Sequence, residues 1–283
     1  MSIEFPCSQC GKQYRVDDDK AGKKFRCRKC ETMLQVPTIR SQDEAEFSPG
    51  GSQLFRHKER TVPFELAHGD SDSIEAISHH IEEHIGPVES VFHEIISDLV
   101  HIDIHMVAPT RQQPFYSLVT SGMSEAPMTV PDGLEEFRFA ELMIRLPADW
   151  PMTQDDFHDE NHYWPIRLLK TLARLPHEYD TWLGFGHTVP HGDPAEPYAS
   201  HTKFSCGLVL PMLNVPEGFH ELEISEDKVI HFYGVYPLYA EETQFKLNQG
   251  ADELVKRFEK YEISEVVQTR RKNVCRRGWW PFG

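Results

Sequence analysis

The sequence lacks any apolar stretch long enough to cross a membrane. A spanning helix needs about 18 or more consecutive apolar residues, and polar or charged residues interrupt every such run in this chain of 283 residues. The segment Met1–Cys10 has neither the basic start nor the apolar centre of a secretory signal peptide. We therefore expect a cytoplasmic protein without a membrane span.

Common catalytic and phosphate-binding motifs are also missing. The chain has no G-x4-G-K-[ST] loop, and Gly184-Phe-Gly186 begins a dinucleotide fingerprint whose third glycine position holds Val189. No G-x-S-x-G segment marks a serine nucleophile. Cys206 lies in an apolar run, and no Cys-His signature accompanies Cys275 among its basic neighbours. We expect no catalytic residue, and hence not an enzyme.

Positive charge is scarce in the middle of the chain. The net charge is −16, with +4 in residues 1–40 and +5 in residues 266–283, which leaves −25 in residues 41–265. A body this acidic repels a phosphate backbone, so any contact with nucleic acid must lie in the two basic ends. Solubility alone is an equally simple interpretation of the acidity.

The cysteines are concentrated at the N-terminal end. Four of the six form two C-x2-C pairs, Cys7 with Cys10 and Cys27 with Cys30. Zinc is commonly held by four thiolates in a tetrahedron, and a unit of about 35 residues needs such a metal because it cannot bury a sufficient core. We predict one structural Zn²⁺ ion at these four positions. Redox pairs and disulfides are the alternatives, but redox C-x2-C motifs normally lie in a βαβ unit.

The segment around these pairs reads as a small β unit with a basic surface. Gln13–Val16, Lys23–Arg26 and Met33–Val36 are predicted strands, with a turn at Asp17–Gly22. Its basic residues could contact nucleic acid or an acidic partner. The simpler interpretation, which we favour, is that they offset the negative charge of a four-thiolate centre. They are Lys12, Arg15, Lys20, Lys23, Lys24, Arg26, Arg28 and Lys29.

Composition divides the chain into four parts. We expect a zinc ribbon over 1–37, a flexible linker over 38–62, a large domain over 63–275 and a basic, aromatic tail over 276–283. The linker has no apolar rhythm and contains the turn-forming run Ser48–Ser52, whose sequence is Ser-Pro-Gly-Gly-Ser.

The large domain mixes predicted helices and strands. Isoleucines at three- and four-residue spacing follow Ser71–Ser73 and predict a helix that stops at Gly86-Pro87. A second helix is expected to open at Trp164-Pro165, and residues 240–260 are expected to be helical with a break near Asn248–Gly250. The predicted strands are Val88–Ile96, Leu99–Val107, Phe115–Thr120, Phe137–Leu146, Phe204–Leu213 and Lys228–Tyr236. Because these elements show no regular βαβ alternation, the expected fold class is α+β.

One predicted strand carries a polar face. His101, Asp103 and His105 alternate with Ile102, Ile104 and Met106, and residues two apart on a strand point to the same side. This spacing would let two imidazoles and a carboxylate hold a metal. The group could equally be a polar face of the sheet or a surface that recognises a partner, so we leave these three interpretations open.

A loop rich in glycine and proline gathers aromatic and polar residues. Trp182 and Tyr198 accompany Asp180 and His187 in this stretch, and aromatic residues of this kind often anchor protein interfaces. The alternative is a loop that packs onto the core with its own aromatics. Under the first interpretation, Asp180, Trp182, His187 and Tyr198 are candidates for partner binding.

Several separated runs resemble one known family. His101–Thr110, Tyr116–Ser124, Ala140–Pro151 and Tyr179–Thr188 are similar to the suppressor of fused (SUFU) domain, and Arg271–Cys275 resembles its end. The resemblance covers roughly residues 63–275. It implies an α+β domain with a mixed sheet and packed helices, no known catalysis, and work by binding another protein.

The resemblance also implies kinds of partner. Animal members restrain a transcription factor of the Hedgehog pathway by gripping an extended segment of it, and bacterial members are thought to include immunity proteins that neutralise toxins. This chain is shorter than the animal proteins, and the zinc ribbon is not part of their pattern, so the bacterial type is the closer likeness.

We therefore expect a non-catalytic module that sequesters a partner protein or an extended peptide, in an immunity or regulatory role. Its partner-binding candidates are His101, Asp103, His105, Asp180, Trp182, His187 and Tyr198. Two alternatives remain. One is a metal-dependent hydrolase that uses His101, Asp103 and His105, and the other is a regulator whose zinc ribbon touches nucleic acid.

Overall fold

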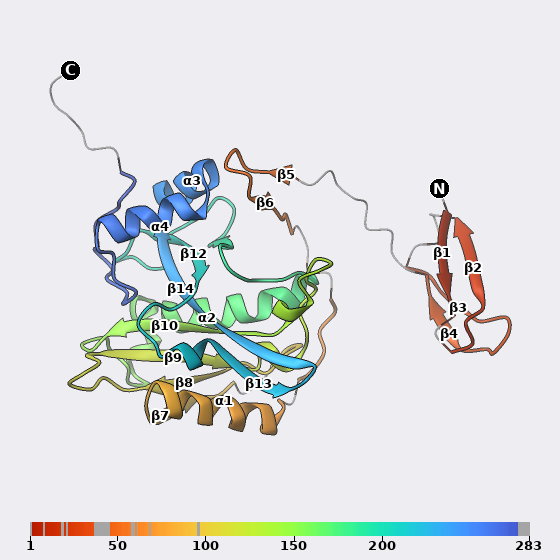
Figure 1. The fold of residues 1–283 in the computed structure, drawn as a ribbon, viewed down its shortest axis with the longest axis horizontal. Helices are drawn as coiled ribbons and strands as arrows, with labels where there is room; N and C mark the ends of the chain where they lie inside the picture. The colour runs from red at the N-terminus through yellow and green to blue at the C-terminus, as the bar shows by residue number, and fades with distance from the viewer. Residues whose placement is uncertain are drawn as a thin grey trace, which may run out of the picture. The chain divides into compact units, whose positions relative to one another are not determined.

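A computed structural model describes most of the chain and divides it into two units (Figure 1). The described residues are 2–7, 9–17, 20, 22–36, 46–57, 60, 62–67, 69–94 and 97–276. The first unit comprises Met1–Phe47 with Gln53–Phe55, and the second comprises Ser48–Ser52 with Arg56–Gly283. Within the described residues, no helix is long and apolar enough to cross a membrane.

The first unit consists of short antiparallel hairpins. Strand β1 (Ser2–Pro6) pairs with β2 (Gln13–Asp17), β3 (Lys24–Arg26) with β4 (Met33–Gln35), and β5 (Glu46–Phe47) with β6 (Gln53–Leu54). Its small core comprises Phe5, Cys7, Cys27, Leu34 and Val36. The sequence predicted β2, β3 and β4 but not β1, which is the partner of β2.

The second unit is built on one mixed sheet. Its strands are β7 (Val88–Phe92), β8 (Asp103–Val107), β9 (Phe115–Ser121), β10 (Ala140–Pro147), β11 (Thr188–Pro190), β12 (Phe204–Leu210), β13 (Glu221–Ser225) and β14 (Lys228–Tyr239). Their order in space is β11-β12-β14-β10-β9-β8-β7, and β13 also pairs with β14. The β10–β14 pair is parallel and the other pairs are antiparallel. The predicted α+β class with a mixed sheet is confirmed.

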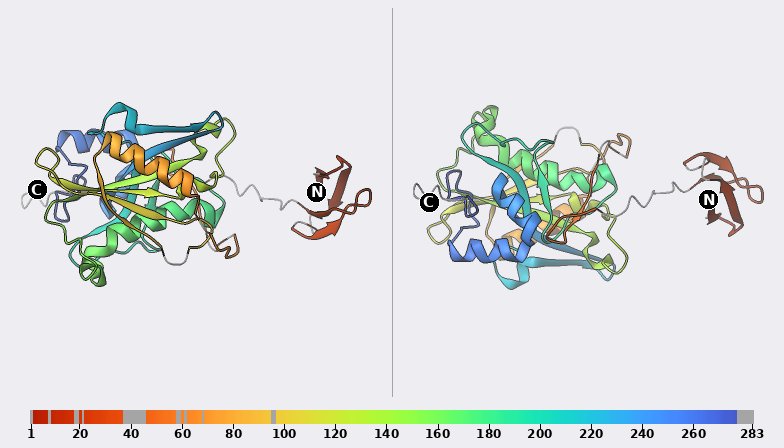
Figure 2. Two further views of the ribbon diagram at one scale, coloured as in Figure 1. Left: turned by 90° about the horizontal axis from the view of Figure 1, so that it is seen from below. Right: turned by 90° about the horizontal axis from the view of Figure 1, so that it is seen from above.

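Helices pack on both faces of this sheet (Figure 2). They are α1 (Ser71–His84), α2 (Glu160–Tyr179), α3 (Ala240–Gln249) and α4 (Ala251–Lys260), and short 3₁₀ turns lie at Met123–Glu125, Glu135–Arg138, Asp156–His158 and Glu217–His220. Leu142 and Ile144 of β10 belong to the core under α2, whereas Met143 between them belongs to the core under α1. Because successive side chains of a strand point to opposite faces, α1 and α2 cover opposite faces of the sheet.

The local signals explain where these helices begin and end. The Asp70 side chain caps α1 by accepting a hydrogen bond from the Asp72 N–H, one residue before the predicted Ser71–Ser73 cap. Gly250 separates α3 from α4, as the sequence predicted. Helix α2 was predicted to open at Trp164-Pro165. It instead begins at Glu160, because Asp159 supplies the cap, and Pro165 lies inside the helix.

Four predicted strands are shorter than expected. Strand β10 begins at Ala140 rather than Phe137, and β12 ends at Leu210 rather than Leu213. Strand β8 begins at Asp103 rather than Leu99, since Leu99 takes a positive φ of 66° that breaks an extended chain. Strand β7 ends at Phe92 rather than Ile96, and Ile95 and Ile96 lie outside the described residues. These two ends matter because His93, just beyond β7, lies next to Asp103, the first residue of the neighbouring strand β8.

The C-terminal segment is fastened to the sheet by buried charges. Arg145 of β10 pairs with Glu265, and its carbonyl accepts a hydrogen bond from the N–H of Val267. Arg271 pairs with Glu242 of α3, 2.6 Å away, and its guanidinium lies over the ring of Phe204. These contacts hold residues 265–271 against β10 and α3. Residues 277–283 of the predicted tail lie outside the described residues.

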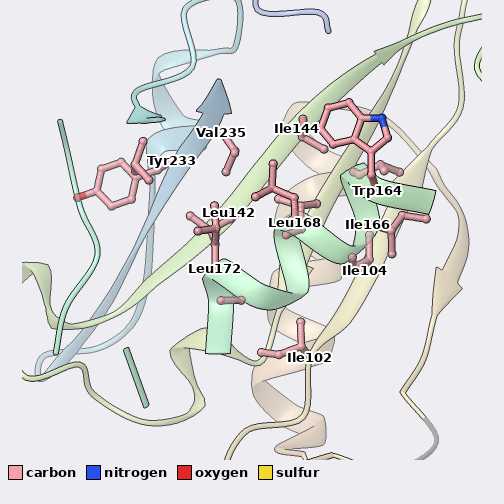
Figure 3. Close-up of a cluster of buried hydrophobic side chains, with 14 of the residues drawn as sticks. Ile102, Ile104, Leu142, Ile144, Trp164, Ile166, Leu168, Leu172, Tyr233 and Val235 are labelled. Carbon is pink, nitrogen blue, oxygen red and sulfur yellow. The ribbon is translucent and has the colours of Figure 1, made fainter. Parts of the chain in front are cut away.

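The largest core lies between α2 and the sheet. Figure 3 shows Trp164, Leu168 and Leu172 of α2 facing aliphatic side chains of β8 and β10. Leu172 is 1% exposed. Burial of this kind supplies most of the free energy of folding.

Replacing Leu172 with alanine should lower the free energy of unfolding by about 2 to 5 kcal/mol, because it leaves a cavity in this core. The matched change Leu213→Ala, at a side chain that is 74% exposed, should alter stability by less than about 0.5 kcal/mol. Urea unfolding of the two variants measures both values. Equal losses would show that α2 does not cover the main core.

Candidate functional site

The two C-x2-C pairs adopt the same backbone turn. In the first turn, the Cys7 N–H donates to the Lys12 carbonyl and the Gly11 N–H donates to the Cys7 carbonyl, at 2.8 and 2.9 Å. The second turn repeats this pattern at Cys27, with Thr32 and Glu31 in the corresponding places. Gly11 and Glu31 take positive φ values of 67° and 59°. Each turn therefore directs its two sulfurs to the same side.

The four sulfurs converge in space. All four Sγ atoms lie within 4.8 Å of one another, and the pairs Cys7–Cys30 and Cys10–Cys27 are 3.6 Å apart. Zinc–sulfur bonds of about 2.3 Å place tetrahedral ligands about 3.8 Å from each other. The residues thus fit a four-thiolate zinc centre. The sulfurs are too far apart for disulfides, whose S–S bond is about 2.05 Å.

Hydrogen bonds prepare one of these thiols for metal binding. Burial acts to raise the pKa of Cys27, but hydrogen bonds from the Tyr14 hydroxyl and the Lys29 N–H to its sulfur hold that pKa at about 5. Because the thiolate is the form that binds metal, this environment favours a ligand at Cys27. The metal would have a structural role, since all four positions are filled by protein.

The polar strand face of the second unit gathers around one carboxylate. Asp103 is 2% exposed, and its two oxygens face different imidazoles. His93 Nδ1 lies 2.8 Å from Oδ2, and His101 Nε2 lies 3.0 Å from Oδ1. These three residues, rather than the predicted trio, bring their ligand atoms together.

His105 does not join this group. Its Nε2 lies 2.9 Å from the Ser121 hydroxyl, and its Nδ1 is buried without a hydrogen-bond partner. Burial lowers the pKa of His105 to about 4, so the ring is neutral at pH 7. The three residues proposed for a hydrolase, His101, Asp103 and His105, therefore do not form one site. Asp103 contacts His101, whereas His105 contacts Ser121.

A second layer of polar residues surrounds His101. The Ser97 hydroxyl lies 2.6 Å from His101 Nδ1 and donates to Glu94 Oε2 at 3.1 Å. Glu94 also accepts a hydrogen bond from Arg174 Nη2 at 2.6 Å and lies 3.7 Å from the Lys170 ammonium. Glu94 is thus neutralised by two cations of α2, and it positions Ser97 against His101.

The aromatic loop after α2 forms a separate group. Asp180 ends α2 with a positive φ of 51° and accepts a hydrogen bond from the Thr129 hydroxyl. Trp182 is half-buried, and its ring meets the His187 ring edge-on with centroids 4.3 Å apart. A Cβ on Gly184 would lie 2.9 Å from the Trp182 ring, so this contact requires glycine there.

Tyr198 lies in the core instead of the surface of this loop. It is 5% exposed and stacks on Trp164 with centroids 5.3 Å apart. Phe185, by contrast, is 53% exposed. The loop is fixed to β12 by two hydrogen bonds, from the Gly186 N–H to the Val209 carbonyl and from the Val209 N–H to the His187 carbonyl.

Sequence reasoning missed His93. In the β7–β8 ladder, Val91 pairs with His105 and Phe92 with Ile104, so the next step of the same register sets His93 opposite Asp103. Both residues are visible in the sequence, but the register in which β7 pairs with β8 is not. Only the pairing of the two strands could have found this contact.

Comparisons with known proteins point to one family. The family model described as Suppressor of fused protein (SUFU) matches residues 98–272. A solved SUFU homologue from Neisseria gonorrhoeae is 16% identical, with a TM-score of 0.55, and the match covers 74% of this chain and all (100%) of that one. A Sufu–Fu complex structure is 14% identical, with a TM-score of 0.51, and covers 71% of this chain and 92% of that one.

A third structure, Drosophila Suppressor of Fused, is 12% identical with a TM-score of 0.46 over 71% of this chain and 50% of that one. No curated protein matches the chain significantly. The first two structural matches support the mixed-sheet fold described above.

Purified protein should carry zinc that depends on the paired cysteines. Changing Cys27 and Cys30 to serine should remove one zinc per chain, because serine does not replace a thiolate ligand at this site. Metal analysis by mass spectrometry measures the loss. The matched change Cys206→Ser, at a buried cysteine outside the cluster, should leave the count unchanged. An unaltered count in the Cys27/Cys30 variant would disprove the ribbon site.

His187 should make the protein less stable in acid. Burial, with help from the charge of Lys246, lowers the pKa of His187 to about 4. An unfolded histidine titrates near 6.5, so between these values the unfolded chain binds the extra proton and stability falls as the pH is lowered. The contribution reaches at most about 3 kcal/mol.

The variant His187→Asn should therefore lose less stability than the natural protein between pH 7 and pH 4. The variant His79→Asn, at an exposed position of α1, controls for the removal of a histidine. Urea unfolding at both pH values gives the comparison. The same pH dependence in all three proteins would refute the assignment.

Proposed function

The chain belongs to the suppressor of fused family, and on this basis we propose that residues 63–275 form a non-catalytic module that holds a partner protein. The observation that carries the proposal is the family match over residues 98–272, which spans the sheet from β8 to β14 together with α2, α3 and α4. A protein of the same fold has been solved in a Sufu–Fu complex, which supports a binding role.

The proposed contact surface is the loop from Trp182 to His187 together with strand β11. Strand β11 is the last strand at its end of the sheet within the described part of the chain. An extended peptide can add to such an edge by main-chain hydrogen bonds. The exposed ring of Phe185 and the half-buried ring of Trp182 would supply side-chain anchors beside it.

The other predicted partner-binding residues act mainly as supports in this proposal. Tyr198 is buried at 5% exposure and its ring lies 4.8 Å from that of His191, next to β11, so it supports the surface from below. His105 is buried at 1% exposure on β8, far from β11 in the order of the strands, and takes no part in this surface. Asp180 sets the direction in which the chain leaves α2. His101 and Asp103 lie at the start of β8, and we assign them a separate role below.

The charge of the domain indicates the chemistry of the partner. Residues 41–265 carry a net charge of −25, so long-range attraction would speed association with a basic protein or peptide. This fits a chain of the bacterial type that sequesters one partner in an immunity or regulatory role. We place it in the cytoplasm, where cysteine thiols stay reduced.

The four-part organisation completes the proposal. The ribbon over 1–37 is a unit held by one structural Zn²⁺ at Cys7, Cys10, Cys27 and Cys30, joined by a linker over 38–62 to the module, and the tail spans 276–283. One part of the linker is structured: the Gly50 N–H donates to the Leu247 carbonyl of α3 at 2.8 Å.

Capture of the partner from the cells that make the protein tests the contact surface. The full chain should retain one dominant protein in a fixed ratio. The variant Phe185→Ser should weaken that complex at least about 30-fold, the effect of losing an interface anchor worth about 2 kcal/mol. Affinity measured by calorimetry with the identified partner gives the factor.

The matched control is Ile224→Ser on β13, at an apolar side chain that is 37% exposed. It should bind as tightly as the natural protein. Equal weakening by both changes would show that the loop after α2 is not the contact surface. Failure to retain any protein would remove the support for a sequestering role.

A further inference from the structure

The geometry points to a second metal site in the protein, formed by His93, His101 and Asp103 and suited to a divalent ion such as Zn²⁺. The two imidazole nitrogens and the carboxylate lie within 4.8 Å of one another. Two histidines and one carboxylate are a common ligand set for zinc and for other divalent transition metals, with further positions left open. This site lies in the second unit and does not depend on the proposed partner binding.

The hydrogen-bond directions favour a cation between His101 and Asp103. Glu94 is paired with Arg174 and Lys170, so it is ionised and only accepts hydrogen bonds. The Ser97 hydroxyl has one proton and gives it to Glu94, at 3.1 Å. At the other side, Ser97 must then accept a proton from His101 Nδ1, which lies 2.6 Å away.

This chain of donors fixes the tautomer of His101. A neutral ring with its proton on Nδ1 presents a lone pair at Nε2, and Nε2 faces the Asp103 oxygen at 3.0 Å. Two lone pairs at this distance repel each other unless a proton or a metal ion lies between them. A metal ion would satisfy both groups and would also engage His93, which a single proton cannot do.

The outer contacts are those expected of a metal ligand. A ligating histidine usually donates its other ring N–H to a hydrogen-bond acceptor, which fixes the ring. Here the acceptor is Ser97, which Glu94 and Arg174 hold in place. Gly122 also helps to hold His101 in place. A Cβ at this position would lie 1.8 Å from the His101 carbonyl oxygen and would displace the backbone of His101.

Charge and access also suit a cation. The nearby cations Arg174 and Lys170 pair with Glu94, whereas the buried Asp103 carboxylate is left with the two imidazoles and the Glu94 N–H, 3.3 Å away. The side chain of His93 is 67% exposed. An ion can therefore enter from solvent at His93 and reach a buried anion.

Zinc counting on the full chain tests the site. After equilibration with Zn²⁺ and removal of free metal, the natural protein should hold two zinc ions per chain, one in each unit. The variant His93→Ala should hold one, and so should the variant with all four ribbon cysteines changed to serine. The control His79→Ala, at an exposed histidine of α1, should hold two.

Co²⁺ in place of Zn²⁺ gives an independent signal. The ribbon site should give sulfur-to-cobalt charge-transfer absorption, and the second site should give weaker bands that His93→Ala removes. Because His93 is exposed, its change should leave the thermal unfolding temperature of the metal-free protein unaltered. Ser97→Ala, which touches no metal, should weaken the second site about 10- to 100-fold, as changes around a ligand do.

Three results would overturn the site. One is a single zinc per chain in the natural protein that the four-serine variant lacks. Another is a second zinc that persists in both His93→Ala and Asp103→Asn, since that ion must lie elsewhere. The third is a Ser97→Ala protein with unchanged affinity at the second site, because His101 would then not be held as the structure shows.

Discussion

The parallel pairing of β10 with β14 holds the second unit together as one sheet. It aligns Ala140 with His231 and Met143 with Gly234, and it joins two antiparallel groups of strands into one sheet. Without it, the strands β7 to β9 would be separated from β11, β12 and β13. The same strand β10 also receives the C-terminal segment through Arg145, Glu265 and Val267. Segments far apart in sequence thus belong to one sheet, and this sheet positions both the loop after α2 and the cluster at Asp103.

Local patterns in the sequence were sufficient for the elements but not for their pairing. The isoleucine spacing of α1 and the break at Gly250 depend on neighbouring residues, so both could be predicted. The start of α2 was missed because the sequence offers two start signals. Asp159 is a good N-cap residue, and Pro165 is favourable in a first turn, so the local pattern did not decide between them. The parallel pair and the position of His93 opposite Asp103 depend on register between distant segments, which no local pattern encodes. The family resemblance supplied the mixed sheet in advance.

The two units reach stability by different physical means. The second unit buries large apolar clusters on both faces of its sheet, so it needs no cross-link. The first buries only a few side chains around its cysteines, and a metal would supply the free energy that so small a core cannot. Charge also changes along the chain, from +4 in residues 1–40 to −25 in residues 41–265. In our proposal the acidic stretch attracts a basic protein partner, and the aromatic loop beside β11 supplies the anchors for it.

In the function proposed above, the protein holds a partner and leaves it chemically unchanged. Native mass spectrometry of the full chain, purified with its captured partner and followed over hours at 25 °C, tests this most directly. The account predicts a persistent complex of fixed ratio in which the partner keeps its covalent mass. A partner that is released with an altered mass, or one that is replaced by products at a steady rate, would contradict the account and establish a catalytic role.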